Sequence, residues 1–222
     1  MAFLTRYTTP ADLPQRIPVF PLAGALLLPR AELPLNIFEQ RYLDMVSDAM
    51  AGDRLIGMIQ PEPGAEKDER PALLRVGCAG RITAYAETPD ERILITLTGI
   101  SRFMLIEELD VGTAYRQVVA DFHPFAVDLT SDLGANEVNR SALLKAFRDY
   151  LNANDMKADW DQVDAASTEV LVNTLSLLAP YPPQEKQALL EAPDLKTRAD
   201  VLVALTEMAL RRMSGGDKQR LQ

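Results

Sequence analysis

Short apolar runs, separated by turn residues, dominate the first half of the chain and predict strands. The expected strands are residues 17–20, 25–28, 55–59, 73–86, 92–107 and 114–122. Ile93, Ile95 and Leu97 alternate with other side chains, which is typical of a half-buried strand. Pro18 restricts the first run to a sheet edge or a strand start, because proline donates no hydrogen bond to a ladder. Gly99 predicts a bulge or a sharp bend.

A helical pattern interrupts these strands between residues 36 and 52. Asn36, followed three residues later by Glu39, forms a capping-box pattern and predicts that the helix begins there. Apolar side chains then recur at helical spacing, at Tyr42, Met45, Val46, Ala49 and Met50. Gly52 is placed to end the helix. If Asn36 is the cap, Asn36→Ala should lower the stability by about 1 kcal/mol.

After about residue 125 the apolar side chains follow helical spacing only. Helices are predicted over residues 141–151, 168–178 and 184–192, and Pro182 and Pro183 suit the first turn of the third. Asp194 occupies the N-cap position of a fourth helix. Several short strands with one inserted helix predict a small, partly closed barrel, so the expected fold class is α+β.

These patterns divide the chain into four parts: an N-terminal arm (1–14), a barrel subdomain (15–124), a helical subdomain (125–213) and a flexible tail (214–222). Residues 60–71 hold three prolines, a glycine and six charged side chains, so they are expected to form an exposed loop. The last segment, SGGDKQRLQ, is typical of a frayed end.

The charge balance disfavours some partners. The formal net charge is -9, which opposes binding to nucleic acids and to anionic membranes. Cys78 is the single cysteine, so no intrachain disulfide forms and no oxidising compartment is required. The N-terminus has no apolar stretch of signal-peptide length, and no apolar run approaches the roughly 20 residues of a membrane span. A cytoplasmic protein is expected.

Few residues offer catalytic chemistry. His123 is the single histidine, and we interpret it as a partly exposed residue at the end of a strand. Cys78 is interpreted as a small buried apolar side chain. One histidine and one cysteine do not make a zinc site, and no phosphate-binding glycine loop is present. A hydrolase built on two carboxylates stays open, because such a pair is formed in space. The sequence therefore predicts no enzyme, no cofactor and no metal.

Longer segments carry a family resemblance. The stretch IPVFPL at 17–22, the stretch PLNIFEQRY at 34–42 and the pair Gly57-Met58 resemble the opening of the Lon-protease N-terminal substrate-binding domain family. Residues 76–105 are similar to later stretches of that family, and 182–202 are similar to its helical part. The resemblance covers roughly residues 15–213.

The resemblance implies a PUA-like β-barrel followed by an all-helical bundle. It also implies a stand-alone module without the ATPase and Ser-Lys peptidase parts of the full proteases. By resemblance the chain binds unfolded or partly folded polypeptides, and acts with a separate protease or chaperone. An apolar groove with a polar rim would be required. Candidate walls of that groove are Phe20, Leu22, Leu35, Phe38 and Phe103.

Three charged residues of the resembling segments receive structural roles. Glu39 is expected at the helix start, where backbone amides favour an anion. Arg41 and Arg102 are each expected to pair with a carboxylate of the barrel. Two other functions stay open: RNA binding, since PUA-like barrels also occur in RNA-associated proteins, and a small-molecule site inside the barrel. A basic stripe on the surface would favour the first, and a filled interior would exclude the second.

Overall fold

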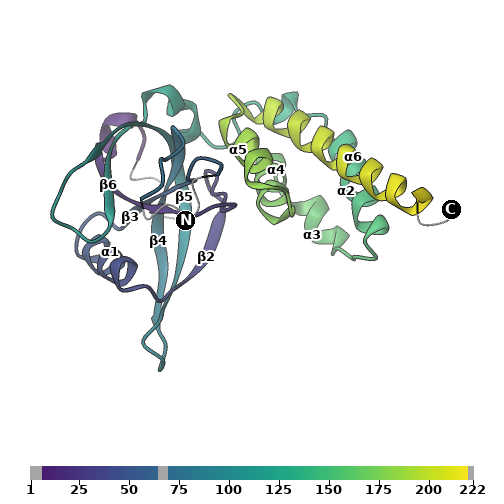
Figure 1. The fold of residues 1–222 in the computed structure, drawn as a ribbon. Helices are drawn as coiled ribbons and strands as arrows, with labels where there is room; N and C mark the ends of the chain where they lie inside the picture. Colours follow the sequence, from purple (N-terminus) through teal and green to yellow (C-terminus); the bar gives the residue numbers. More distant parts are fainter. Residues whose placement is uncertain (1–6, 65–69, 220–222) are drawn as a thin grey trace. The chain divides into compact units, whose positions relative to one another are not determined.

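The structure is a computed structural model that describes residues 7–64 and 70–219. These residues form two compact units. The first unit contains the described residues up to Ser131 together with Pro180–Leu190, and the second contains Asp132–Ala179 together with the described residues from Glu191 onward. Figure 1 shows that the strands belong to the first unit, whereas the second is helical.

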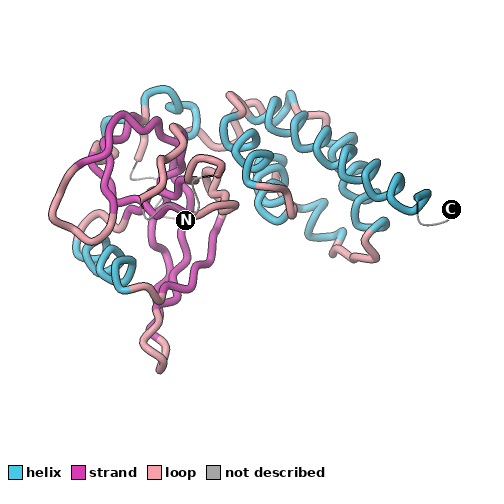
Figure 2. Tube along the Cα trace, in the orientation of Figure 1, coloured by secondary structure: helices cyan, strands magenta, loops and turns pink. Residues whose placement is uncertain are grey.

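Six strands form one sheet in the first unit (Figures 1 and 2). They are β1 (Arg16–Pro21), β2 (Glu32–Ile37), β3 (Leu55–Ile59), β4 (Val76–Glu87), β5 (Ile93–Leu109) and β6 (Arg116–Asp121). Their order is β2-β5-β4-β3-β1-β6, and β5 also pairs with β6. That last pairing joins the strands β5, β4, β3, β1 and β6 into a closed ring, to which β2 adds as an outer strand.

The strand β1, which contains Pro18, has neighbours on both sides. β1 pairs with β3 in parallel from Val19 to Pro21, and with β6 in antiparallel fashion from Arg16 to Val19. The two ladders are staggered, so Pro18 faces β6 alone and needs no ladder hydrogen bond toward β3. β1 is therefore not an edge strand, but Pro18 lies near its start and is paired on one side only, a position that a proline tolerates.

The second predicted strand was also wrong. Residues 25–28 form a loop, although Leu26, Leu27 and Leu28 are all buried. The strand lies further along the chain, at β2, where Leu33 and Leu35 pair with Leu97 and Ile95 of β5. Burial explains the apolar character of 25–28, and burial alone does not require a strand.

Gly99 marks the irregularity that its position predicted. The β4–β5 register shifts between Ala79 and Gly80, so that Ala79 is opposite Ser101 while Gly80 is opposite Gly99. The Gly99 N–H donates to Ala31 O at 2.9 Å, and its carbonyl accepts from Arg30 N at 2.8 Å. A Cβ atom at Gly99 would lie 2.0 Å from the Leu28 carbonyl oxygen. Only glycine permits this approach of the 28–31 loop to the strand.

The inserted helix begins later than predicted. It is α1 (Gln40–Ala51), and Glu39 occupies its N-cap position without a side-chain capping hydrogen bond. Asn36 lies in β2 opposite Leu94, so the predicted Asn36 cap is wrong. The buried face of α1 is the predicted one, and Gly52 ends the helix as expected. The capping pattern assigned Asn36 to the helix start, but in the structure this residue is paired in the β2–β5 ladder.

The interior of the ring is filled by side chains. Phe103 is fully buried there and meets Phe122 edge-on at 6.1 Å between ring centroids. A Cβ atom at Gly77 would lie 2.5 Å from the Phe103 ring, so glycine at this position makes room for the aromatic side chain. The surrounding core cluster includes Ile17, Val19, Leu55, Ile59, Ala79, Ile100, Val118 and Ala120. This packing argues against a small-molecule site inside the ring.

The second unit contains α2 (Arg140–Ala153), α3 (Trp160–Ala165), α4 (Thr168–Leu178) and α6 (Leu195–Gln219). The helix α6 packs against both α2 and α4. Side chains of Asn139, Asp159 and Ser167 cap the first three helices. The six-residue helix α3 was not predicted, because DWDQVDA has no apolar stripe. The helix α6 continues through Gln219 into the predicted tail, of which residues 220–222 lie outside the described part.

The helix α5 (Pro183–Glu191) differs from its predicted place in the helical subdomain. Its residues up to Leu190 cluster with the strands. The buried amide of Gln187 donates to Val76 O at 3.1 Å, and its oxygen accepts from Gln60 Nε2 at 3.0 Å. Gln60 in turn accepts from Gly24 N at 2.9 Å. A chain of buried amides therefore holds this helix to the sheet, and polar contacts of this kind leave no periodic signal in the sequence.

The two predicted helix caps, Asp194 and Asn36, differ in how much their substitution should lower the stability. Asp194 accepts from Thr197 N at 2.7 Å, as its N-cap position predicted, and this hydrogen bond lowers the pKa of its carboxyl. We expect Asp194→Ala to lower the free energy of unfolding by about 1 kcal/mol, and Asn36→Ala to change it by less than about 0.5 kcal/mol. Urea unfolding at neutral pH measures both changes. Because the folded-state pKa is lowered, the contribution of Asp194 is lost as the pH falls through that pKa. Equal losses from both variants would contradict the helix starts described above.

Candidate functional site

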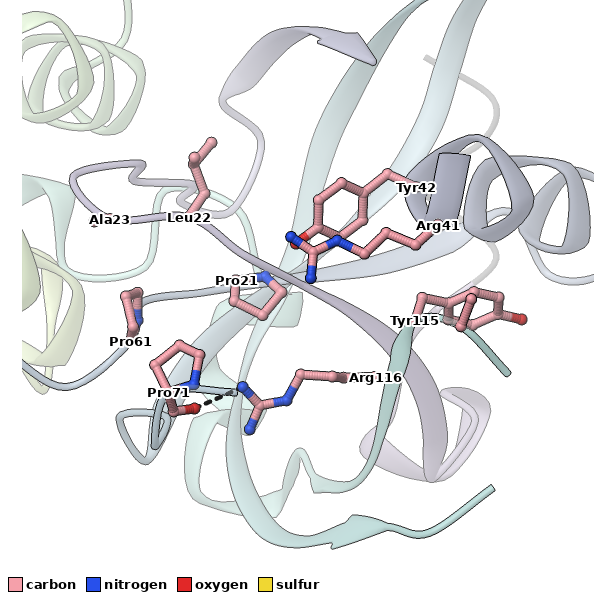
Figure 3. A pocket seen from close by; sticks show the side chains of 10 residues that line it. Pro21, Leu22, Ala23, Arg41, Tyr42, Pro61, Pro71, Tyr115 and Arg116 are labelled. Atoms are coloured by element: carbon pink, nitrogen blue, oxygen red, sulfur yellow. Dashed lines mark hydrogen bonds between the residues drawn. The ribbon is translucent and has the colours of Figure 1, made fainter. Parts of the chain in front are cut away.

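A pocket of about 220 Å³ opens on the first unit, beside the end of β1 and the start of α1 (Figure 3). Segments far apart in the sequence line it: the end of β1 and its following loop, the first turn of α1, the segment at Pro61 and Pro71, and the start of β6. The lining residues are Pro21, Leu22, Ala23, Arg41, Tyr42, Pro61, Pro71, Ala114, Tyr115 and Arg116. Prolines and Leu22 supply apolar walls, and the described lining residues include two guanidinium groups and no carboxylate.

Arg41 reaches the pocket from the first turn of α1. Its Nη2 atom lies 2.8 Å from Glu39 Oε2, and its guanidinium carbon lies 4.6 Å from the centroid of the Tyr42 ring. Glu39 precedes the helix and is not a residue of the sheet, so the predicted pairing of Arg41 with a barrel carboxylate is wrong. The arginine is about half exposed. A stacked and partly ion-paired guanidinium keeps its position while still offering N–H groups to a ligand.

Arg116 enters the pocket from the first residue of β6. Its Nη1 atom donates to the carbonyl of Pro71 at 2.6 Å, the contact drawn in Figure 3. Its Nε and Nη2 atoms bind the two oxygens of Glu108, a residue of β5 that also accepts from Arg70. These arginines lower the pKa of the Glu108 carboxyl, chiefly through the hydrogen bond from Arg116. The arrangement fixes Arg116 firmly at the pocket wall.

Tyr42 combines a buried ring with a hydroxyl that faces the pocket. Its ring lies 4.2 Å from the ring of Phe20, measured between centroids, and the residue is only 7% exposed. Burial raises the pKa of Tyr42, and the nearby Arg41 and Arg116 partly offset that rise. Figure 3 shows the hydroxyl beside the Arg41 guanidinium. No hydrogen bond joins this hydroxyl to another residue within the described part of the chain.

Tyr115 lines the same pocket with its ring but directs its hydroxyl elsewhere. The hydroxyl donates to Asp48 Oδ2 of α1 at 2.7 Å and points away from both arginines in Figure 3. Burial, with the Asp48 carboxylate, raises the pKa of Tyr115 to about 12. The two tyrosines therefore share a pocket but not a role, since Tyr115 ties β6 to the helix.

The five residues predicted as groove walls do not form one surface. Leu22 lines the pocket and is 37% exposed, and Phe20 lies beneath it as the support of Tyr42. Phe103 belongs to the core, while Leu35 is half-buried in β2. Phe38 is 63% exposed just after β2, with the Arg92 guanidinium 5.7 Å from its ring. The ligand-binding role of each residue stays a prediction.

Sequence reasoning missed Tyr42, Tyr115 and Arg116. A signal was available, because the dipeptides Arg41-Tyr42 and Tyr115-Arg116 place the same two residue types side by side in distant segments. These residues lie close together because β6 closes the ring. No local sequence pattern predicts that closure. Arg102 forms a fixed ion pair, since its guanidinium binds both oxygens of buried Asp128, but Asp128 lies in the 3-10 helix His123–Leu129, so the partner is not a residue of the sheet or of the predicted barrel range.

Other candidate chemistry is sparse. His123 is an exposed residue whose Nδ1 atom lies 2.8 Å from Asp121 Oδ1, which matches its interpretation as a junction residue. Cys78 is fully buried, also as interpreted. In the described ranges, no three histidine, cysteine or acidic side chains gather as a metal would require. Nor does any described helix combine the length and apolar character that crossing a bilayer demands.

Comparison with known proteins identifies the family to which the chain belongs. A model described as the ATP-dependent protease La (LON) substrate-binding domain matches residues 16–207. The chain belongs to the LON substrate-binding domain family. Every residue that lines the pocket falls inside the matched range.

Relatives and solved structures agree with this membership. Lon protease 2 of Myxococcus xanthus is 24% identical over 204 residues, which cover 87% of this chain and 24% of that protein. A Lon protease of Desulfosudis oleivorans is 33% identical over 96 residues, which cover 42% of this chain and 12% of that protein. This LON substrate-binding domain thus spans about a quarter or less of the length of these curated relatives.

Two solved structures show the same fold. The N-terminal domain of the Mycobacterium avium complex Lon protease aligns with a TM-score of 0.64 and 16% identity, covering 86% of this chain and 98% of that one. A Lon N-terminal domain protein from Xanthomonas campestris aligns with a TM-score of 0.57 and 22% identity, covering 85% and 97%. The α+β arrangement with its six-stranded sheet is therefore that of LON substrate-binding domains.

Proposed function

We propose that this chain is a substrate-recognition module that binds exposed segments of unfolded or partly folded polypeptides and contributes no bond-breaking chemistry of its own. The observation that carries the proposal is the family match, which runs through both compact units and includes the whole pocket. The module works in the cytoplasm with a separate protease or chaperone. We further propose that its ring of strands is a PUA-like barrel and its helical unit a bundle.

The pocket chemistry suits a polypeptide. Apolar walls from Pro21, Leu22 and Pro61 remove side-chain surface of a ligand from water, and the guanidinium groups and the Tyr42 hydroxyl supply donors for its carbonyl groups. The filled ring interior favours this surface pocket over an internal small-molecule site. The net charge of -9 favours polypeptide over RNA.

Leu22→Asp tests the proposal, because it places a charge on the apolar wall. We expect it to weaken binding of an unfolded polypeptide by on the order of tenfold, the loss that follows from withdrawing one leucine contact. Fluorescence anisotropy of the full-length chain with a labelled, reduced and alkylated protein measures the affinity. The same protein with its disulfides intact should bind much more weakly.

Leu178→Asp is the matched control, since Leu178 is a more exposed leucine (75%) in α4 of the other unit. It should leave the affinity unchanged. Equal affinity of the wild-type chain for the folded and unfolded forms would contradict the proposed function. Equal loss from both leucine variants would show that the pocket is not the place of binding.

A further inference from the structure

Three hydrogen-bond donors of different residues share the pocket described above: the guanidinium groups of Arg41 and Arg116 and the hydroxyl of Tyr42. Two other cavities of the same unit differ in composition. One, of about 120 Å³, includes Asp48 and Asp53, and the other, of about 430 Å³, includes Asp121. The chain has a net charge of -9, yet the described residues that line this pocket include two cationic side chains and no acidic one, which favours an anionic ligand.

The arginines keep donors for a ligand although both form ion pairs. Arg41 uses Nε and Nη2 for Glu39, so the two N–H groups of Nη1 are not taken by that carboxylate. Glu39 and Glu108, the acidic partners of the two arginines, are not among the lining residues. The lining therefore includes the two cationic side chains but neither of the glutamates that pair with them.

Tyr42 provides the second, independent observation. A tyrosine that is 93% buried usually finds a partner for its hydroxyl, as Tyr115 does with Asp48. The Tyr42 hydroxyl instead ends at the pocket beside Arg41, with no hydrogen-bond partner in the described part of the chain (Figure 3). Because the ring is fixed, the hydroxyl stays beside the guanidinium groups, where it can donate a hydrogen bond to a ligand.

We propose that this pocket takes a carboxylate of a polypeptide ligand, held by Arg41, Arg116 and the Tyr42 hydroxyl, with a neighbouring apolar side chain against Pro21, Leu22 and Pro61. This proposal rests on the polypeptide-binding function proposed above. It adds the chemical group that the pocket recognises, which is a carboxylate. A C-terminal carboxylate and an Asp or Glu side chain share this chemistry. Guanidinium groups bind carboxylates through charge-assisted hydrogen bonds, which are about twice as strong as neutral ones.

Four probes test which anionic group the pocket binds: a C-terminal carboxylate, a side-chain carboxylate or any small anion. We use a fluorescent apolar nonapeptide with a free C-terminus, the same peptide with an amidated C-terminus, the amidated peptide with one internal Glu, and inorganic phosphate as a competitor. Anisotropy titrations with the full-length chain should give about tenfold weaker binding for the amidated peptide. Recovery by the internal Glu would show that side-chain carboxylates also enter. Competition by phosphate at low millimolar concentration would show instead a general anion site and would overturn the carboxylate assignment.

Tyr42→Phe and Tyr85→Phe form a matched pair of variants. Tyr42→Phe keeps the buried ring and removes only the pocket hydroxyl, so we expect about tenfold weaker binding of the free-carboxylate peptide with unchanged thermal stability. Tyr85→Phe removes a hydroxyl of β4 that donates to Glu87 Oε1 at 2.7 Å outside the pocket, so we expect unchanged affinity for the same peptide. Arg41→Gln should weaken binding similarly, and Arg41→Lys should restore part of it.

The outcomes separate this proposal from the proposed function. If the amidated and free peptides bind equally and Tyr42→Phe has no effect, the carboxylate site is refuted while polypeptide binding stands. If no peptide and no unfolded protein binds, both proposals fail. A loss confined to the free-carboxylate peptide, in both Tyr42→Phe and Arg41→Gln, supports the assignment.

Discussion

Gly99→Ala is expected to destabilise the strand unit by about 3 kcal/mol or more. The added Cβ would lie 2.0 Å from the carbonyl oxygen of Leu28 and 2.7 Å from its carbonyl carbon. Both atoms belong to backbone that the Arg30 and Ala31 hydrogen bonds hold against Gly99, so no flexible side chain can move aside. Relief of the clash requires loss of these hydrogen bonds. Urea unfolding followed by far-UV circular dichroism measures the change.

Gly112→Ala is the control for this substitution. Nothing lies within 4 Å of a Cβ placed there, and its backbone does not adopt the left-handed conformation. The expected change is therefore close to zero or slightly stabilising, because alanine restricts the unfolded chain more than glycine does. A Gly99→Ala protein as stable as Gly112→Ala would mean that the 28–31 loop does not rest on β5.

Asp128→Ala is expected to cost about 3–5 kcal/mol, because it leaves a buried guanidinium without its counterion. Arg102 is 1% exposed, and Asp128 binds it through Nε at 2.8 Å and Nη2 at 2.7 Å. The same carboxylate accepts from the Arg102 backbone N–H at 2.9 Å. The guanidinium also donates to Leu190 O and lies 4.6 Å from the Phe125 ring centroid. Chemical unfolding of the full-length chain measures the loss.

Two further variants separate the causes of this loss. Asp149→Ala removes one partner of the exposed Lys145–Asp149 pair and should change the stability by less than about 0.5 kcal/mol. Arg102→Met combined with Asp128→Leu removes both buried charges and should recover much of the stability lost by Asp128→Ala. No recovery in the double variant would show that the pair acts mainly through its hydrogen bonds to the backbone and not through its charges.

The strands that sequence reasoning located well are those with strong local signals. The alternation of Ile93, Ile95 and Leu97 and the bulge at Gly99 both came from neighbouring residues, and both are present. The helix at 168–178 was predicted with its correct bounds, because apolar residues at helical spacing follow directly after Ser167. Local propensity and tertiary packing agree at these places.

The failures have a common cause in partners that are distant in sequence. Asn36 had good capping chemistry, but a ladder to Leu94 placed it in a strand instead. The pocket shows the same effect, since Arg41 and Arg116 meet only because β6 closes the ring beside α1. Leu22 was predicted because it is apolar and lies in a resembling segment. Tyr42 was assigned to the buried face of a helix, and that assignment was correct for its ring but gave no information about its hydroxyl.

The strand unit is not a continuous stretch of chain, and this has a consequence for how the molecule can be divided. The chain leaves that unit after Ser131 and returns for Pro180–Leu190. A protein ending at Ser131 would lack the Leu190 carbonyl that Arg102 binds and the Gln187 amide that Gln60 and Val76 bind. Its buried donors and acceptors would then have no counterparts. The chain thus passes between the two units three times, and Pro180–Leu190 lies between two stretches of the helical unit, so one cut cannot yield an intact strand unit.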